Sequence, residues 1–223
     1  MKNYVISFCI FCALLTTVNV CEGSEEARKI DNGSYIIYLP EGINESAKYP
    51  LVVALSPSAN AESMLRPWQA VADKYKWIIL SSRQHKNGMD FKEIGNIFSN
   101  TIRNVILSYP VDERKVVATG FSGGGMSSHY LSMAYPKLIR AVVINTGMIS
   151  EHYATGKSYY YPKNKLAVFL ASPSDFRYQE MRRDNSFLKN NGWQTEWIEF
   201  EGGHTIAPES VYLRAAQWLN ERL

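Results

Sequence analysis

The segment that most constrains the fold of this chain is a glycine-flanked serine within residues 115–126, Lys-Val-Val-Ala-Thr-Gly-Phe-Ser-Gly-Gly-Gly-Met. Its β-branched first half is typical of a strand, and residues 124–135 can continue as a helix that Pro136 closes. The two glycines of the G-x-S-x-G pattern carry no Cβ, so the strand can turn into the helix within very few residues. The sequence therefore predicts a tight strand-to-helix turn with Ser122 at its apex.

A turn of this kind holds the hydroxyl of Ser122 above the sheet, beside the first N–H groups of the following helix. These groups have no partner within the helix and lie at its positive dipole end, so they can stabilise a developing oxyanion. Nucleophilic acyl transfer needs such a pairing of a hydroxyl with backbone donors. Gly-Ser-Gly clusters also occur in plain turns, so the motif needs support from residues elsewhere in the chain.

Short β-branched runs alternate with longer amphipathic stretches over most of the chain. This alternation predicts an α/β fold with a mostly parallel sheet, helices on both faces, and functional residues at the carboxyl ends of the strands. The runs at 35–39 and 51–55 could pair as an antiparallel edge of that sheet. We expect strands at 35–39, 51–55, 78–81, 116–120, 141–145, 167–171 and 195–200, and helices at 63–75, 124–135, 178–190 and 210–223, with one more helix from Asp90 that has a capping box with Glu93.

The first 21 residues are typical of a secretory leader. Lys2 is followed by the apolar run 5–15, which is shorter than the ~20 residues that a membrane span needs. We therefore expect an exported protein, secreted or periplasmic. The remaining residues, 22–223, suffice for one sizeable hydrophobic core and are few for two, so we expect a single domain.

The only cysteines, Cys9, Cys12 and Cys21, all fall within this leader. The folded domain is therefore expected to contain no disulfide. Two alternatives remain for the leader itself: ordinary cleavage near Gly23, or acylation of Cys21 as the mature N-terminus of a lipoprotein. A lipid anchor at Cys21 is the one membrane attachment that we expect.

The charge balance argues against several classes of partner. Without the leader, which contains one lysine and no acidic residue, the net charge falls from +3 to +2. The sequence has no basic stripe of the kind that binds nucleic acid, and no internal repeat. No pair of histidines has metal-ligand spacing, so we expect neither a metal nor a cofactor.

Four histidines are available to serve as the base that a serine nucleophile needs. His204 lies in a glycine-rich loop directly after the strand expected at 195–200, at the carboxyl edge of the sheet. His152 lies in a loop and is the main alternative. His85 belongs to a polar loop, where we expect a solvated residue or one at the rim of a cleft, and His129 falls within the helix after the serine and points away from it. His204 is therefore the predicted base.

The acidic partner of this base is predicted to be Asp175. It follows the strand expected at 167–171 by four residues, in a loop at the carboxyl edge of the sheet. Asp184 falls within a helix, where surface ion pairs with neighbouring arginines are expected, and Glu201 is close to the base in sequence but can point away. Asp175 is therefore the candidate that orients His204 and stabilises its protonated form.

Three segments resemble secreted α/β-hydrolase esterases of the poly(3-hydroxybutyrate) depolymerase and feruloyl esterase type. They are residues 111–124 around the serine, residues 49–55 (Tyr-Pro-Leu-Val-Val-Ala-Leu) and Gly-Gly-His at 202–204, so the resemblance spans nearly all of the chain after the leader. It implies the α/β-hydrolase fold, the chain order serine, aspartate, histidine, and hydrolysis of carboxylic esters. The catalytic residues that it implies are Ser122, Asp175 and His204.

One departure from this family concerns the oxyanion hole. Such enzymes often have His-Gly after the strand that corresponds to residues 51–55, whereas this chain has Ser-Pro-Ser-Ala-Asn at 56–60. Pro57 has no N–H, so the expected donors are Gly123 together with Ser58 or Ala59. Because one donor contributes on the order of 3 kcal/mol to transition-state stabilisation, a misplaced loop would slow the enzyme rather than abolish it.

The sequence thus predicts an exported serine hydrolase that acts on a small-molecule or polymer-linked ester. The resemblance alone suggests a feruloyl, acetyl or hydroxyalkanoate ester. Two alternatives remain open: a serine peptidase of the same fold, and a non-catalytic exported binding protein, which the altered loop at 56–60 motivates. A cluster of tyrosines could stack on sugars or aromatic acyl groups, although such clusters more often supply packing area. Its members are Tyr153, Tyr159, Tyr160 and Tyr161.

Overall fold

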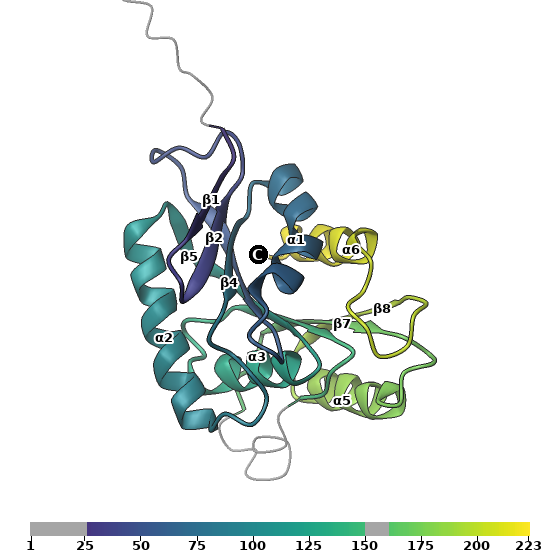
Figure 1. The fold of residues 1–223 in the computed structure, drawn as a ribbon. Coiled ribbons are helices and arrows are strands. Elements are labelled where there is room, and N and C mark those ends of the chain that lie inside the picture. Colours follow the sequence, from purple (N-terminus) through teal and green to yellow (C-terminus); the bar gives the residue numbers. More distant parts are fainter. Residues whose placement is uncertain (1–25, 150–160) are drawn as a thin grey trace, which may run out of the picture.

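The computed structural model describes residues 26–149 and 161–223, and these form three layers with a sheet in the middle (Figure 1). The expected leader, His152 and the tyrosines from 153 to 160 lie outside the described residues. Helices cover both faces of the sheet, and the sheet is mostly parallel. The α/β fold predicted from the alternation of strands and helices is thereby confirmed, and it has the architecture that the resemblance to α/β-hydrolases implies.

The sheet has eight strands in the order β1-β2-β4-β3-β5-β6-β7-β8. The six strands from β4 to β8 in this order pair in parallel, and β1 and β2 form an antiparallel edge. Their bounds are β1 (Arg28–Asp31), β2 (Tyr35–Leu39), β3 (Tyr49–Leu55), β4 (Ile78–Ser82), β5 (Val111–Phe121), β6 (Ala141–Asn145), β7 (Leu166–Ala171) and β8 (Gln194–Glu199).

The antiparallel edge differs from the expected one in two ways. β2 pairs with β4, with Ile37 opposite Leu80, and not with β3 as expected from the short connection between them. β3 instead lies between two parallel neighbours, β4 and β5. The outermost strand, β1, was not expected at all, because its four residues are all exposed and show no apolar alternation.

The helices agree with the expected segments to within a few residues at their ends. Asp90 caps α2 as expected, since its side chain accepts hydrogen bonds from the N–H groups of Lys92 and Glu93. None of the helices in the described ranges is long and apolar enough to cross a membrane. Their bounds are α1 (Ala61–Tyr75), α2 (Phe91–Ser108), α3 (Gly123–Ala134), α5 (Tyr178–Asn190) and α6 (Glu209–Asn220).

Two hydrophobic cores lie on opposite faces of the sheet. One is formed with α1 and α6, and the other with α2, α3 and α5 (Figure 1). All five residues of β6 and all six of β7 are buried, because side chains on both faces of these strands meet a helical layer. Burial on both sides holds the central strands rigidly, and the loops at their carboxyl ends therefore start from well-defined positions.

Candidate active site

The turn between β5 and α3 is as tight as the sequence predicts. Ser122 has φ 53° and ψ −121°, a conformation that residues with a side chain rarely adopt. A Cβ on Gly120 would lie 2.2 Å from the carbonyl carbon of Gly124, and one on Gly124 would lie 2.0 Å from the carbonyl oxygen of Leu55. Both positions therefore require glycine, since a side chain would displace the backbone of α3 or β3.

The structure brings together the three residues predicted from separate loops. The His204 Nε2 lies 3.0 Å from the Ser122 Oγ, and the His204 Nδ1 lies 2.7 Å from an oxygen of Asp175. These distances allow one continuous chain of hydrogen bonds from a hydroxyl through an imidazole to a carboxylate. Such a chain can move a proton from the serine to the histidine while the aspartate stabilises the positive charge that forms.

The carboxylate of Asp175 is fully buried, whereas the ring of His204 is partly exposed. The N–H of Arg177 donates to the other Asp175 oxygen at 2.6 Å, so both oxygens accept hydrogen bonds. A buried carboxylate with two such donors is held in one orientation and remains satisfied as an anion. Asp175 can therefore fix which nitrogen of His204 carries the proton.

The loop that carries His204 is anchored by Asn145, the last residue of β6. The Asn145 amide donates to the carbonyl of Thr205 at 3.1 Å and accepts from the N–H of Ala207 at 2.8 Å and the hydroxyl of Tyr212 at 2.7 Å. Sequence reasoning missed Asn145, although a polar residue that ends a fully apolar strand run was a signal for it. Asn145 thus ties the loop after β8 to the centre of the sheet.

The expected oxyanion donors differ in their availability. The Ala59 N–H donates to the carbonyl of His85 at 2.8 Å and is therefore committed within the loop. The Ser58 N–H makes a longer contact, 3.2 Å, with the Ser56 Oγ. Gly123 is the first residue of α3, beside Ser122. Of these two loop donors, the Ser58 N–H is the one that a ligand oxygen could bind while breaking only a long hydrogen bond.

His85 is buried, so the expectation of a solvated histidine or one at a cleft rim is wrong. Its Nδ1 lies 2.5 Å from the carbonyl of Ser56 and its Nε2 lies 2.8 Å from the hydroxyl of Ser127. Burial lowers the pKa of His85, which keeps the ring neutral and able to serve one donor and one acceptor. His85 thereby links the loop after β3 to α3, the helix that begins directly after Ser122.

His129 and Asp184 have structural partners rather than a place beside Ser122. His129 is fully buried, with its Nε2 against the hydroxyl of Tyr161. Asp184 accepts a hydrogen bond from the backbone N–H of Ile149 at 2.9 Å, a role not foreseen when surface ion pairs were expected for it. These contacts tie both side chains to neighbouring parts of the structure.

Two phenyl rings flank the imidazole of His204. The ring centroid of Phe121 lies 5.0 Å and that of Phe176 lies 4.7 Å from the centroid of His204. Phe121 is partly buried, while Phe176 is largely exposed. Two apolar rings therefore lie against the imidazole, one from the edge of the core and one from the surface.

A cleft of about 550 Å³ opens next to the loop of His204. Its lining comes from the start of α1 and from the residues just before α6, so it lies between the loop after β3 and the loop after β8. In the described ranges no three or more side chains of His, Cys, Asp or Glu are grouped to hold a metal ion. The residues that line the cleft are Asn60, Glu62, Ser63, Arg66, Pro67, Ile206, Ala207, Pro208 and Glu209.

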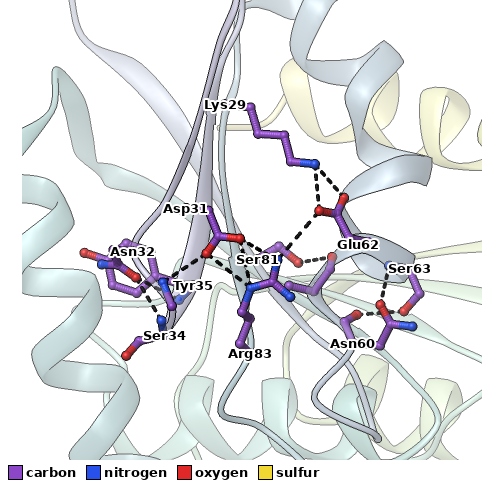
Figure 2. Close-up of polar contacts among 12 residues, drawn as sticks. Lys29, Asp31, Asn32, Ser34, Tyr35, Asn60, Glu62, Ser63, Ser81 and Arg83 are labelled. Carbon is purple, nitrogen blue, oxygen red and sulfur yellow. Dashed lines mark hydrogen bonds and ion pairs between the residues drawn. The ribbon is translucent and has the colours of Figure 1, made fainter.

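A second polar group, here called the edge cluster, consists of Lys29, Asp31, Glu62 and Arg83. Figure 2 shows Arg83 between Asp31 of β1 and Glu62 at the start of α1. Lys29 completes the group with two contacts of 2.6 and 2.8 Å to Glu62. These side chains remain substantially exposed, and they tie the edge strand β1 to α1 and to the loop after β4.

Comparison with known families identifies one match. A family model described as phospholipase/carboxylesterase matches residues 55–212, well over half of the chain, including Ser122, Asp175 and His204. A probable acetylxylan esterase A from Neosartorya fischeri is 24% identical over 182 residues, which are 66% of this chain and 48% of that protein. The chain thus spans about half the length of this curated relative.

Solved structures resemble the whole fold. A Bacillus cereus carboxylesterase has a TM-score of 0.65 at 17% identity, with 85% of this chain and 94% of that chain covered. A substrate-bound, fluorophosphonate-binding serine hydrolase from Staphylococcus aureus has a TM-score of 0.62 at 11% identity, with 87% and 97% covered. Likeness at such low identity concerns the arrangement of helices and strands.

Proposed function

This chain belongs to the phospholipase/carboxylesterase family of α/β-hydrolases, and on this basis we propose that it cleaves carboxylic esters through a covalent acyl-enzyme on Ser122. The observation that carries the proposal is the continuous hydrogen-bond chain from Ser122 through His204 to the buried Asp175. A binding protein has no need of a serine in a strained turn with a base 3.0 Å from its hydroxyl.

The proposed reaction has two steps of the same kind. His204 Nε2 takes the proton of Ser122 while the Oγ bonds to the ester carbonyl carbon, and collapse of the tetrahedral intermediate expels the alcohol, which His204 protonates. Water then attacks the acyl-enzyme with His204 again as the base, which releases the acid and restores Ser122. Asp175 keeps the Nδ1 proton in place throughout and stabilises the imidazolium.

The N–H groups of Gly123 and Ser58 are proposed to hold the oxyanion. Gly123 starts α3, where the helix dipole adds to its hydrogen bond. The Ser58 N–H has to leave the Ser56 Oγ, and the length of that contact, 3.2 Å, makes the exchange easy. His85 supports this arrangement, because it holds the carbonyl of Ser56 on one side and the hydroxyl of Ser127 on the other.

Export, the extent of the domain and the class of ester are proposed from the sequence. Residues 1–21 have the charge and apolar pattern of a leader, which supports export of a single domain at 22–223, either free or anchored through Cys21. The resemblance to poly(3-hydroxybutyrate) depolymerases and feruloyl esterases, together with the acetylxylan esterase relative, favours an ester carried on a larger molecule. Acetylated polysaccharide and feruloyl esters are the first substrates to test.

The proposal is tested by Ser122→Ala. Wild type is expected to hydrolyse p-nitrophenyl acetate and to be labelled by a fluorophosphonate probe, whereas Ser122→Ala is expected to lose labelling and at least about 10⁴-fold in kcat. Ser186→Ala, an exposed serine on α5, is the matched control and should behave as wild type. Equal rates in wild type and Ser122→Ala would contradict the proposal, and an unlabelled, inactive wild type would favour a binding protein.

A further inference from the structure

Among the aromatic residues that the structure describes, Phe176 is unusual because the residue is 72% exposed. The other exposed large hydrophobic residues in the described ranges are Ile30 on the edge strand β1 and Leu107 near the end of α2. A single exposed hydrophobic side chain is ordinary on a protein surface, so exposure alone has no meaning here. What distinguishes Phe176 is that it follows Asp175 directly and lies against His204.

The position of the ring relative to the reacting groups is well defined. Its centroid lies 4.7 Å from that of His204, at an interplanar angle of 42°. Phe121, the second aromatic ring against this imidazole, is partly buried and packs against the core. Phe176 therefore presents a largely exposed phenyl surface next to the base that the reaction uses.

Two backbone hydrogen bonds hold the turn that contains Phe176. The Asp175 N–H donates to the carbonyl of Ser172 at 2.9 Å, and the Tyr178 N–H donates to the carbonyl of Asp175 at 3.1 Å. The guanidinium of Arg177 lies 5.1 Å from the centroid of the phenyl ring and is itself paired with Glu180 at 3.1 Å. The contacts with His204 and Arg177 restrict the phenyl side chain, which lowers the conformational entropy that it loses when a ligand binds to it.

We propose that Phe176 is a stacking platform for a ring-shaped part of the ester substrate, either an aromatic acyl group or the sugar ring that carries the acyl group. This inference rests on the function proposed above. Both ligands present a flat face of C–H or π character, which an exposed phenyl ring binds through area burial and ring-to-ring contact. The expected tyrosine cluster is not required for this contact, since Phe176 is already beside His204.

The test compares esters with and without a ring, in Phe176→Ala, Phe176→Leu and Phe176→Trp. The measured quantity is kcat/KM for methyl ferulate and for an acetylated xylo-oligosaccharide, each divided by kcat/KM for ethyl acetate. We expect Phe176→Ala and Phe176→Leu to lower this ratio about 10-fold for the ring ester that the protein uses, mainly through KM, and Phe176→Trp to retain it. Leu107→Ala, on the exposed end of α2, is the control and should leave the ratio unchanged.

The two ring esters distinguish which ring binds to Phe176. A fall in the kcat/KM ratio confined to methyl ferulate identifies an aromatic acyl group. A fall confined to the acetylated oligosaccharide identifies a sugar ring. A ratio that stays constant in Phe176→Ala, with all esters slowed alike, would overturn the platform and show that the ring merely supports His204. An unchanged ratio in Phe176→Leu would also overturn the proposed stacking platform, because leucine has no ring to stack on. The esterase proposal itself is judged separately, by Ser122→Ala on ethyl acetate, so that the failure of one proposal is not mistaken for the failure of the other.

Discussion

The site around Ser122 and the edge cluster are both built from short polar contacts, but they differ in burial. The carboxylate of Asp175 is 0% exposed and lies 2.7 Å from His204. In the edge cluster, the side chains of Asp31 and Glu62 are 42% and 47% exposed, although their contacts with Arg83 and Lys29 are as short, 2.5 and 2.6 Å. Contact length therefore does not separate the two groups.

This difference indicates that burial decides how much free energy is lost when each contact is broken. When an exposed ion pair is broken, water replaces the lost partner, and salt screens the charges in either state. When a buried hydrogen bond is broken, the remaining polar group has neither a protein partner nor water to bond with. The free-energy cost of removing that group from water is then no longer offset. Substitutions at the site should therefore have large effects, and matched substitutions in the edge cluster should have small ones.

The largest effect is expected from Asp175→Asn. The amide keeps the shape of the carboxylate but can donate to His204 Nδ1, which favours the tautomer with the proton on Nε2 and leaves no base for Ser122. We expect a loss of about 10⁴-fold in kcat for an activated ester. Asp31→Asn in the edge cluster is the matched control, and similar rates in the two variants would refute the role given to Asp175.

A smaller effect is expected from Asn145→Ala. This change removes the acceptor of the Ala207 N–H and the Tyr212 hydroxyl, and it frees the loop of His204 from β6. We expect the free energy of unfolding to fall by about 3 kcal/mol, measured by urea denaturation, together with a drop in kcat. Asn32→Ala at the exposed turn before β2, which removes an amide that accepts two N–H groups, should change stability far less. Equal losses of unfolding free energy in the two variants would contradict the inference that burial decides the size of the effect.

Acid should lower stability through the buried histidine of α3. Burial lowers the pKa of His129 from 6.5 to about 3, so below pH 6.5 the unfolded chain binds a proton that the folded chain does not. The free energy of unfolding should therefore fall by roughly 1 kcal/mol for each pH unit between pH 6 and pH 4, as measured by urea denaturation at several pH values. The slope should become shallower in His129→Gln, and an unchanged slope in that variant would contradict the assignment.

The smallest effect is expected from Arg83→Gln, at the centre of the edge cluster. The arginine lies beside Asp31 and holds the pKa of that carboxyl below its usual range, but both side chains are well solvated. We expect the urea midpoint to stay within experimental error of wild type, at low and at high salt. A clear loss of stability that disappears in 1 M NaCl would show that exposed pairs contribute more here than burial suggests.

Most of the element boundaries could be predicted from the sequence, because strands and helices of this fold are local patterns. The strand 141–145 and the helix 178–190 were predicted with the bounds that the structure has. The exposed strand β1 was missed, since it depends on pairing with β2 rather than on an apolar pattern of its own. The partner of β2 was also missed, because pairing across a sheet is a long-range choice.

By itself the sequence determined the turn at Ser122 and the position of each predicted site residue just after a strand. Gly120 is required by a backbone contact with Gly124, only four residues away, and apolar periodicity indicates where strands end, whereas Gly124 is required by its approach to Leu55 of β3, which only the packed sheet brings near. Tertiary structure alone decided that His85 is buried against Ser56 and Ser127, that Asn145 anchors the loop of His204, and that Phe176 lies against the imidazole. The physical reason is that burial and contact between distant loops depend on how the layers pack, and packing is a property of the whole fold.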